Sequence, residues 1–141
     1  MRSRFSLLLF ICFGFVIGCG EPKLKLPSPA AASGKVTLAN GQPVKNVRIF
    51  FEPIDAMAPA SSAVASDGTF KLKTYDNKDG ACPGKYRVLF RVDQADPNNY
   101  KASSQALQLI PQKYQEEGGS PLEVEIPSGG KTDIDLRLDA R

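Results

Sequence analysis

The sequence predicts an all-β fold, an antiparallel β-sandwich of about seven strands and of the Greek-key type, which follows an N-terminal signal peptide. From Gly34 onward, apolar and polar side chains alternate with a period of two, as in half-buried strands. Pairs such as Asn40-Gly41 and Asp67-Gly68 separate the alternating segments, and both pairs favour tight turns. No segment shows the sustained period of a long helix.

The first half of the domain contains four expected strands. Residues 34–38 and 47–52 carry branched or aromatic side chains at alternate positions, with mainly polar side chains between them. Residues 62–66 show the pattern more weakly, and residues 70–73 resume it after the turn at Gly68. Each of these segments has the length of an ordinary strand.

Three more strands are expected in the second half. Residues 85–93 show the clearest alternation, and residues 122–126 alternate apolar side chains with glutamates. Residues 134–138 complete the domain after a turn at residues 127–130. Because every strand turns one apolar stripe inward, two sheets can share a core, at roughly 25 cal/mol per Å² of buried apolar surface.

The outward faces of these strands differ in charge. The middle strands carry basic side chains, and the last two carry acidic ones: Lys71, Lys73, Lys85, Arg87 and Arg91 against Glu123, Glu125, Asp133, Asp135 and Asp139. We expect neighbouring strands to pair these charges. The alternative is a basic patch for an acidic polysaccharide or lipid.

Two apolar side chains, Phe50 and Leu89, break the polar pattern of the outward faces. The segment 94–120 is longer than an ordinary connection and contains several apolar residues, among them Tyr100 and Tyr114. We expect this segment to fold over the outward face and cover Phe50 and Leu89. The rival interpretation is an exposed partner-binding patch that combines the four side chains.

The N-terminus predicts export and lipidation. A basic start and an apolar run over residues 1–18 are typical of a signal peptide, and Val16 to Cys19 resemble a bacterial lipobox. We expect Cys19 to carry the lipid anchor to the cell membrane, residues 19–33 to form a Pro-rich tether, and residues 34–141 to form the β-sandwich. An ordinary cleaved signal and an uncleaved anchor are the alternatives. In lipoproteins of bacteria with two membranes, Asp after the lipidated cysteine favours retention in the inner membrane. This chain has Gly20 at that position, so we expect the outer membrane, on its periplasmic side, or the cell surface.

Cysteine, histidine and charge exclude several function classes. Cleavage before Cys19 removes Cys12, so Cys82 is left without an internal disulfide partner; we expect it to be buried, with intermolecular pairing as the alternative. The chain has no histidine, which excludes His-based triads and metal sites. Cleavage also removes Arg2 and Arg4 and no acidic residue, so the remaining chain is nearly neutral and gives no argument for nucleic acid.

Two acidic segments contain side chains that could in principle bind calcium or act in catalysis. The run 76–80, Asp-Asn-Lys-Asp-Gly, does not match the ligand spacing of an EF-hand, and a polar turn is the favoured interpretation over a calcium loop of another kind. Glu116 and Glu117 lie in a polar, glycine-flanked stretch where both carboxylates are expected to be solvated. The sequence therefore assigns no catalytic residue, no cofactor and no metal ligand.

Turn glycines and core positions form a set of motifs in residues 33–38, 40–44, 47–53, 65–70, 80 and 83–88. These motifs resemble those of carboxypeptidase-regulatory-like domains, a transthyretin-like family, and residues 110–114 and 129–130 resemble small bacterial lipoproteins that carry this domain. The resemblance implies a prealbumin-like β-sandwich of the kind found in small bacterial lipoproteins. Such domains accompany enzymes or surface assemblies without being catalytic themselves.

The expected function is that of a membrane-anchored extracytoplasmic lipoprotein, a non-catalytic interaction or structural module of the cell envelope. Its expected partners are the membrane, through Cys19, and an envelope protein or glycan. A carbohydrate- or small-ligand-binding lipoprotein is the first alternative. A hydrolase that uses carboxylates is the less favoured one, because no activated nucleophile and base can be named.

Overall fold

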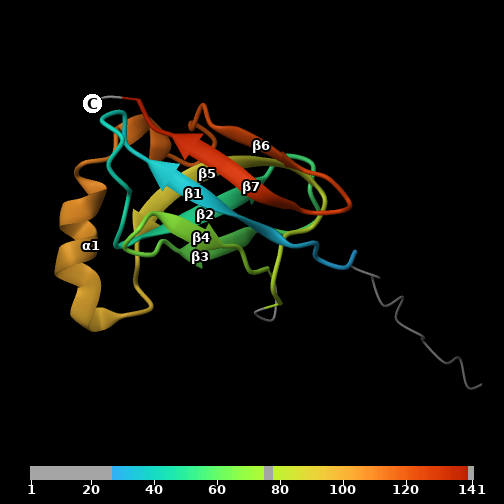
Figure 1. The fold of residues 1–141 in the computed structure, drawn as a ribbon, viewed down its shortest axis with the longest axis horizontal. Helices are drawn as coiled ribbons and strands as arrows, with labels where there is room; N and C mark the ends of the chain where they lie inside the picture. Colours follow the sequence, from blue (N-terminus) through green and yellow to red (C-terminus); the bar gives the residue numbers. More distant parts are fainter. Residues whose placement is uncertain (1–26, 75–77, 140–141) are drawn as a thin grey trace, which may run out of the picture.

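The computed structural model describes residues 27–74 and 78–139, and these form a mainly β structure of two sheets (Figure 1). Seven strands form within this part of the chain, as expected, but the third spans Ala60–Ala63 instead of the expected residues 62–66. Short helical elements join the fifth and sixth strands. In chain order the elements are β1 (Ala32–Thr37), β2 (Val47–Pro53), β3 (Ala60–Ala63), β4 (Thr69–Lys71), β5 (Gly84–Val92), η2 (Pro97–Asn99), α1 (Tyr100–Leu107), η3 (Gln112–Tyr114), β6 (Glu123–Ile126) and β7 (Lys131–Arg137).

The strands form a three-stranded sheet in the order β4-β1-β7 and a four-stranded sheet in the order β3-β2-β5-β6. The expectation of a wholly antiparallel sandwich is wrong for one pair, because β1 and β7 run parallel. β6 and β7 belong to different sheets, so the turn at residues 127–130 carries the chain from one sheet to the other. Alternation of side chains assigns faces to a strand but contains no information on its direction.

Apolar side chains from both sheets fill the space between them. The Phe51 ring of β2 lies 6.0 Å from the Phe70 ring of β4 and 5.8 Å from the Tyr86 ring of β5, measured between centroids. Phe51 and Tyr86 are fully buried, as the alternation predicts. Cys82 is also fully buried with a free thiol, which confirms the expected burial.

The first sheet begins before the expected boundary at residue 34. β1 starts at Ala32, and the backbones of Ala30 and Ala81 form an isolated bridge with hydrogen bonds of 2.9 Å in both directions. The last residues of the expected tether are thus part of the sheet. Their backbone groups gain partners in a segment whose sequence shows no alternation.

The long connection after β5 contains a helix that was not expected. We call residues 94–120 the cover segment; it includes η2, α1 and η3, and α1 packs against β5 and β2 (Figure 1). The Asp96 carboxylate accepts a hydrogen bond of 3.0 Å from the Asn98 N–H, and Pro97 follows at the first helical position. An acidic cap followed by proline is a helix-start signal, and it was present in the sequence.

Candidate functional site

The cover segment lies along the outward face of the four-stranded sheet. Phe50 of β2 and Leu89 of β5 are directly opposite each other in the strand register. Leu89 points away from the sandwich core and is nevertheless only 2 % exposed, whereas Phe50 is half-buried. This burial agrees with a covering role for the segment.

The structure does not bring the four expected patch residues into one exposed surface. Leu89 and Tyr114 are each 2 % exposed, so neither offers area to a partner, and only Tyr100 is largely exposed, at 55 %. The Tyr114 ring packs in the core cluster, and its hydroxyl donates a 2.9 Å hydrogen bond to the Asp139 carboxylate. Of the four residues, Phe50 alone lines a hollow on this face.

Hydrogen bonds hold the cover segment on the sheet near both of its ends. At the first end, the Asp93 N–H donates to the Ser103 hydroxyl at 2.7 Å, and both groups are buried. At the second end, the Gly118 N–H donates to the Glu52 carboxylate at 3.1 Å. The segment is therefore fixed at residues far apart in the sequence, and side chains between these points enclose a groove.

The groove lies between α1 and the outward face of β2 and β5 and has a volume of about 550 Å³. Its walls combine apolar side chains with two arginines and two glutamines. The lining residues are Arg48, Phe50, Phe90, Arg91, Val92, Gln94, Ala95, Leu107 and Gln115. This volume is within the range of about 300–1,000 Å³ that is usual for ligand sites.

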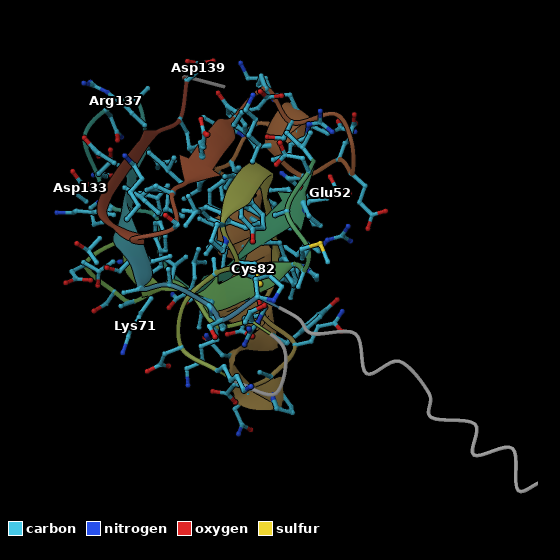
Figure 2. The ribbon with its side chains drawn as sticks, turned by 90° about the vertical axis from the view of Figure 1, so that its right-hand side faces the viewer. Glu52, Lys71, Cys82, Asp133, Arg137 and Asp139 are labelled. Atoms are coloured by element: carbon cyan, nitrogen blue, oxygen red, sulfur yellow. The ribbon has the colours of Figure 1, made fainter. Side chains whose placement is uncertain are left out.

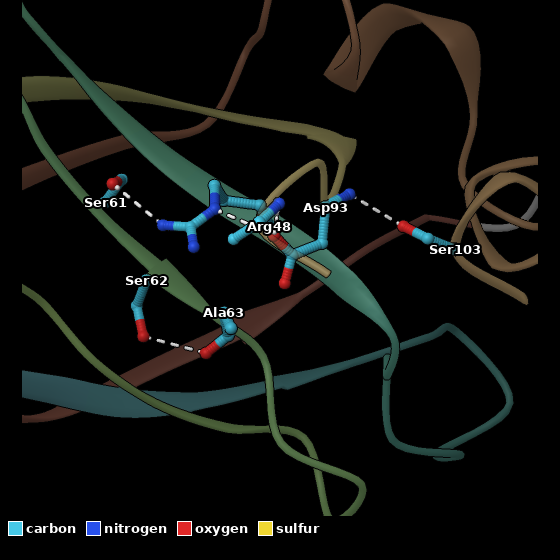
Figure 3. A network of polar contacts seen from close by, with 7 residues as sticks. Arg48, Ser61, Ser62, Ala63, Asp93 and Ser103 are labelled. Carbon is cyan, nitrogen blue, oxygen red and sulfur yellow. Dashed lines mark hydrogen bonds and ion pairs between the residues drawn. The ribbon is translucent and has the colours of Figure 1, made fainter. Parts of the chain in front are cut away.

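The two arginines of the groove have different surroundings. The Arg48 Nε lies 3.2 Å from a carboxylate oxygen of the buried Asp93, and its second nitrogen donates to the Ser61 hydroxyl at 3.3 Å (Figure 3). Arg91 forms an ion pair with Glu117 of the cover segment, and its guanidinium carbon lies 5.9 Å from the centroid of the Phe50 ring. Arg48 is thus part of a closed network, whereas Arg91 lies at the solvent boundary.

A second, shallower hollow lies on the outward face of the three-stranded sheet. Its volume is about 940 Å³, and its lining includes Lys71, Lys73, Asp133 and Asp135. Figure 2 shows Lys71 and Asp133 on this side of the molecule, with Glu52 on the opposite side. No segment like the cover segment is seen over this face in the described chain.

The expected pairing of charges between strands is confirmed for one pair. Arg87 of β5 lies 3.7 Å from the Glu123 carboxylate of β6. Lys71 instead pairs with Asp79 at 2.9 Å, and the Lys71 ammonium holds the pKa of this carboxyl below its ordinary value. The Lys73 ammonium lies 4.0 Å from the same carboxylate, so Asp79 is the acidic partner of both lysines.

The remaining candidate groups do not converge on a reaction site. Glu116 accepts a 3.0 Å hydrogen bond from Gln112, while Glu117 pairs with Arg91, so the two carboxylates have separate partners. Across residues 27–74 and 78–139, no three side chains of the metal-binding types gather. The expected turn at 76–80 lies partly, and Cys19 wholly, outside the described residues.

In the part of the chain that the structure describes, the helices are too short and too polar to cross a bilayer. Comparison with protein-family models, with curated proteins and with solved structures found no match. Among the groove residues, sequence reasoning singled out Phe50, and it named Arg91 only as one of the basic outward side chains. Arg48 and Arg91 occupy ordinary outward positions of strands, and only the fold gives them a helix as a neighbour.

Proposed function

We propose that this protein is a lipid-anchored extracytoplasmic module without catalytic activity, which binds a partner in the cell envelope through the groove between α1 and the four-stranded sheet. The signal-like residues 1–18 and the lipobox-like Cys19 support the anchor. Acyl chains concentrate the domain at a membrane surface, where contacts of modest affinity are sufficient.

One observation carries this proposal: the groove lies at the opposite end of β5 from the entry of the chain. The Cys82 thiol, two residues before β5, lies 3.7 Å from the Pro27 carbonyl oxygen. Arg91 and Val92 are the last two residues of β5, and both line the groove. A strand of nine residues spans about 30 Å, so the groove lies about that far from Pro27, and this separation supports a partner that binds at a distance from an anchor upstream of Pro27.

We also propose that the domain is of the carboxypeptidase-regulatory-like family, with the prealbumin-like sandwich that this family implies. Two sheets of three and four strands support this proposal. So do the turn glycines quoted for the resemblance, of which Gly41 and Gly68 have positive φ of 83° and 84°. A non-catalytic role agrees with the separate partners of Glu116 and Glu117.

The anchor is tested with Cys19→Ala. We expect the variant to lose label from radioactive palmitate and to leave the membrane fraction, because thioether attachment of the lipid needs this thiol. Cys82→Ala is the matched control and should keep both properties, since Cys82 is buried in the folded domain. A Cys19→Ala protein that remains in the membrane with unchanged mass contradicts the lipoprotein proposal.

The role of the groove is tested by photo-crosslinking in cells. A photoreactive amino acid at Gln94, an exposed residue of the groove, is expected to crosslink one discrete envelope component. The same amino acid at Lys35, on the outward face of the other sheet, serves as the control. Equal products from both positions, or none from Gln94, would contradict a partner at this groove.

A second candidate function is the binding of a small ligand or carbohydrate. The 550 Å³ groove, with the Phe50 ring and the amides of Gln94 and Gln115 in its lining, favours it. Its test is a thermal-shift screen of envelope sugars against the wild-type protein and Phe50→Ser. A shift that depends on Phe50, without a crosslinked protein, would favour this function.

A further inference from the structure

Arg91 of the groove binds a carboxylate, and in this structure that carboxylate is Glu117 of the same chain. Glu117 lies on the cover segment, 26 residues after its partner Arg91. Its side chain is 72 % exposed and the Arg91 side chain 43 % exposed, so water reaches both members of the pair. Ion pairs of this kind contribute little to stability, because water and salt screen them.

The carboxylate partner of Arg91 can be replaced more easily than that of Arg48. The Asp93 partner of Arg48 is buried, and its backbone N–H is bound by Ser103 as well (Figure 3). Removing Asp93 from Arg48 would leave a largely buried guanidinium without its carboxylate partner, which is costly. Removing Glu117 from Arg91 leaves both groups to water, so a carboxylate from another molecule can take the place of Glu117.

The surroundings of Arg91 limit what such a carboxylate can belong to. The guanidinium lies over the Phe50 ring, and Leu107 and Val92 form apolar walls beside it. An acidic group with an apolar neighbour fits this combination of charge and apolar surface.

We propose that the groove binds an extended acidic peptide of a protein partner, whose Glu or Asp carboxylate replaces Glu117 on Arg91 while a neighbouring apolar side chain packs between Phe50 and Leu107. The proposal rests on the interaction role proposed above and names the chemistry of the partner. Glu117 then acts as an internal competitor that releases Arg91 when the partner binds.

A peptide is favoured over an acidic glycan for two reasons. The internal occupant is itself a glutamate of a peptide segment, whose next residue, Gly118, donates its N–H to Glu52 at 3.1 Å. The face of the Phe50 ring toward Arg91 is covered by the guanidinium, which leaves less of the ring for a sugar to stack on.

The test uses the full-length protein in detergent micelles and a fluorescein-labelled peptide, Ala-Leu-Glu-Leu-Ala, with binding followed by fluorescence anisotropy. We expect Glu117→Gln to bind about two- to fivefold more tightly than wild type, because the competitor is gone. Arg91→Gln should weaken binding at least about tenfold, since a charge-assisted hydrogen bond is lost. The same peptide with Gln in place of Glu should bind as weakly as Arg91→Gln binds the acidic peptide.

Arg87→Gln is the matched control, because Arg87 is an arginine on the same face of the same strand, with its own carboxylate partner, outside the groove. Its affinity for the acidic peptide should equal that of wild type. Circular dichroism and urea unfolding of each variant are the control measurements that test whether its fold is intact. Binding that Arg91→Gln leaves unchanged overturns the proposal, as does an absence of binding by both wild type and Glu117→Gln.

An oligogalacturonate probe separates the peptide from a glycan. Tighter binding of this probe than of the peptide, with the same dependence on Arg91, would overturn the peptide assignment. A different outcome separates this inference from the proposed interaction role. If Gln94 crosslinks a partner in cells but Arg91→Gln leaves peptide binding unchanged, the acidic-peptide inference is wrong and the interaction role still stands.

Discussion

The phenolic hydroxyl of Tyr114 donates a 2.9 Å hydrogen bond to the Asp139 carboxylate and accepts one of 3.3 Å from the Asp139 backbone N–H. These contacts join the end of the cover segment to the chain just after β7. Lys113 pairs with the same carboxylate. The cover segment is thereby tied to strands of both sheets, since Glu52 of β2 holds it at Gly118.

Replacing Tyr114 by Phe should destabilise the protein by about 1–2 kcal/mol, because the substitution removes a hydrogen bond to a charged acceptor and keeps the buried ring. The measurement is the free energy of unfolding in urea. Tyr100→Phe is the control: Tyr100 is exposed, and its change should lie within about 0.5 kcal/mol. Equal effects of the two substitutions would show that the Tyr114 hydroxyl contributes nothing.

The pKa of Asp139 should lie below the ordinary carboxyl value of about 3.9 in the folded protein. The hydrogen bond from Lys113 is the largest cause, and the one from Tyr114 is second. Because the folded-state pKa is depressed, this contribution to stability is complete above about pH 4 and is lost as the pH falls through the folded-state pKa. NMR titration should show Lys113→Gln raising this pKa, whereas Lys131→Gln, which affects the pair with Asp133, should leave it unchanged.

Tyr86 should resist ionisation in alkali. Burial raises its pKa to about 12, and its hydroxyl lies within hydrogen-bond distance of the Cys82 and Ala58 carbonyl oxygens, at 2.7 and 3.1 Å. Since the folded state favours the neutral phenol, the stability gained is present below about pH 10 and is lost as the pH rises toward 12. Ultraviolet titration of phenolate absorbance should show a late step near pH 12 that Tyr86→Phe removes. Persistence of this step in the variant would contradict its assignment.

Gly34→Ala should destabilise the sandwich by more than about 2 kcal/mol. A Cβ at this position would lie 2.0 Å from the Ile134 carbonyl oxygen, so β1 and β7 would have to separate where they pair in parallel. Gly129→Ala is the control, because a Cβ there meets nothing within 4 Å and the site lies in a turn. Melting temperatures measured by circular dichroism compare the two; a Gly34→Ala protein as stable as Gly129→Ala would show that the close approach is relaxed at little cost.

Much of the fold could be predicted because a strand alternates its faces along the chain itself. Ile49 and Phe51 point into the core, and Arg48 and Phe50 point outward, as their alternation indicates. The burial of Cys82 was predictable because a cysteine without a disulfide partner behaves as a small apolar side chain. The Asp96 cap and Pro97 in the sequence indicate the start of η2, but α1 begins directly after it at Tyr100 with Asn99 as a cap that makes no side-chain hydrogen bond, so no such signal precedes α1 itself.

The candidate site was less predictable, because it depends on contacts between distant segments. Phe50 and Leu89 drew attention only as exceptions to a polar face, and nothing local distinguishes Arg91 from Arg87 on the same strand. Tyr114 and Tyr100 have opposite exposure, because the tertiary structure packs the Tyr114 ring into the core cluster and leaves Tyr100 at the surface.

By itself, the sequence determined approximately where the strands lie, which face of most strands is apolar and where the chain turns, since these properties depend on neighbours along the chain. The tertiary structure alone decided that β7 runs parallel to β1, that α1 packs against β2 and β5, and that Glu117 forms an ion pair with Arg91. The physical reason is that strand direction and long-range ion pairs depend on groups brought together only when the two sheets and the cover segment pack.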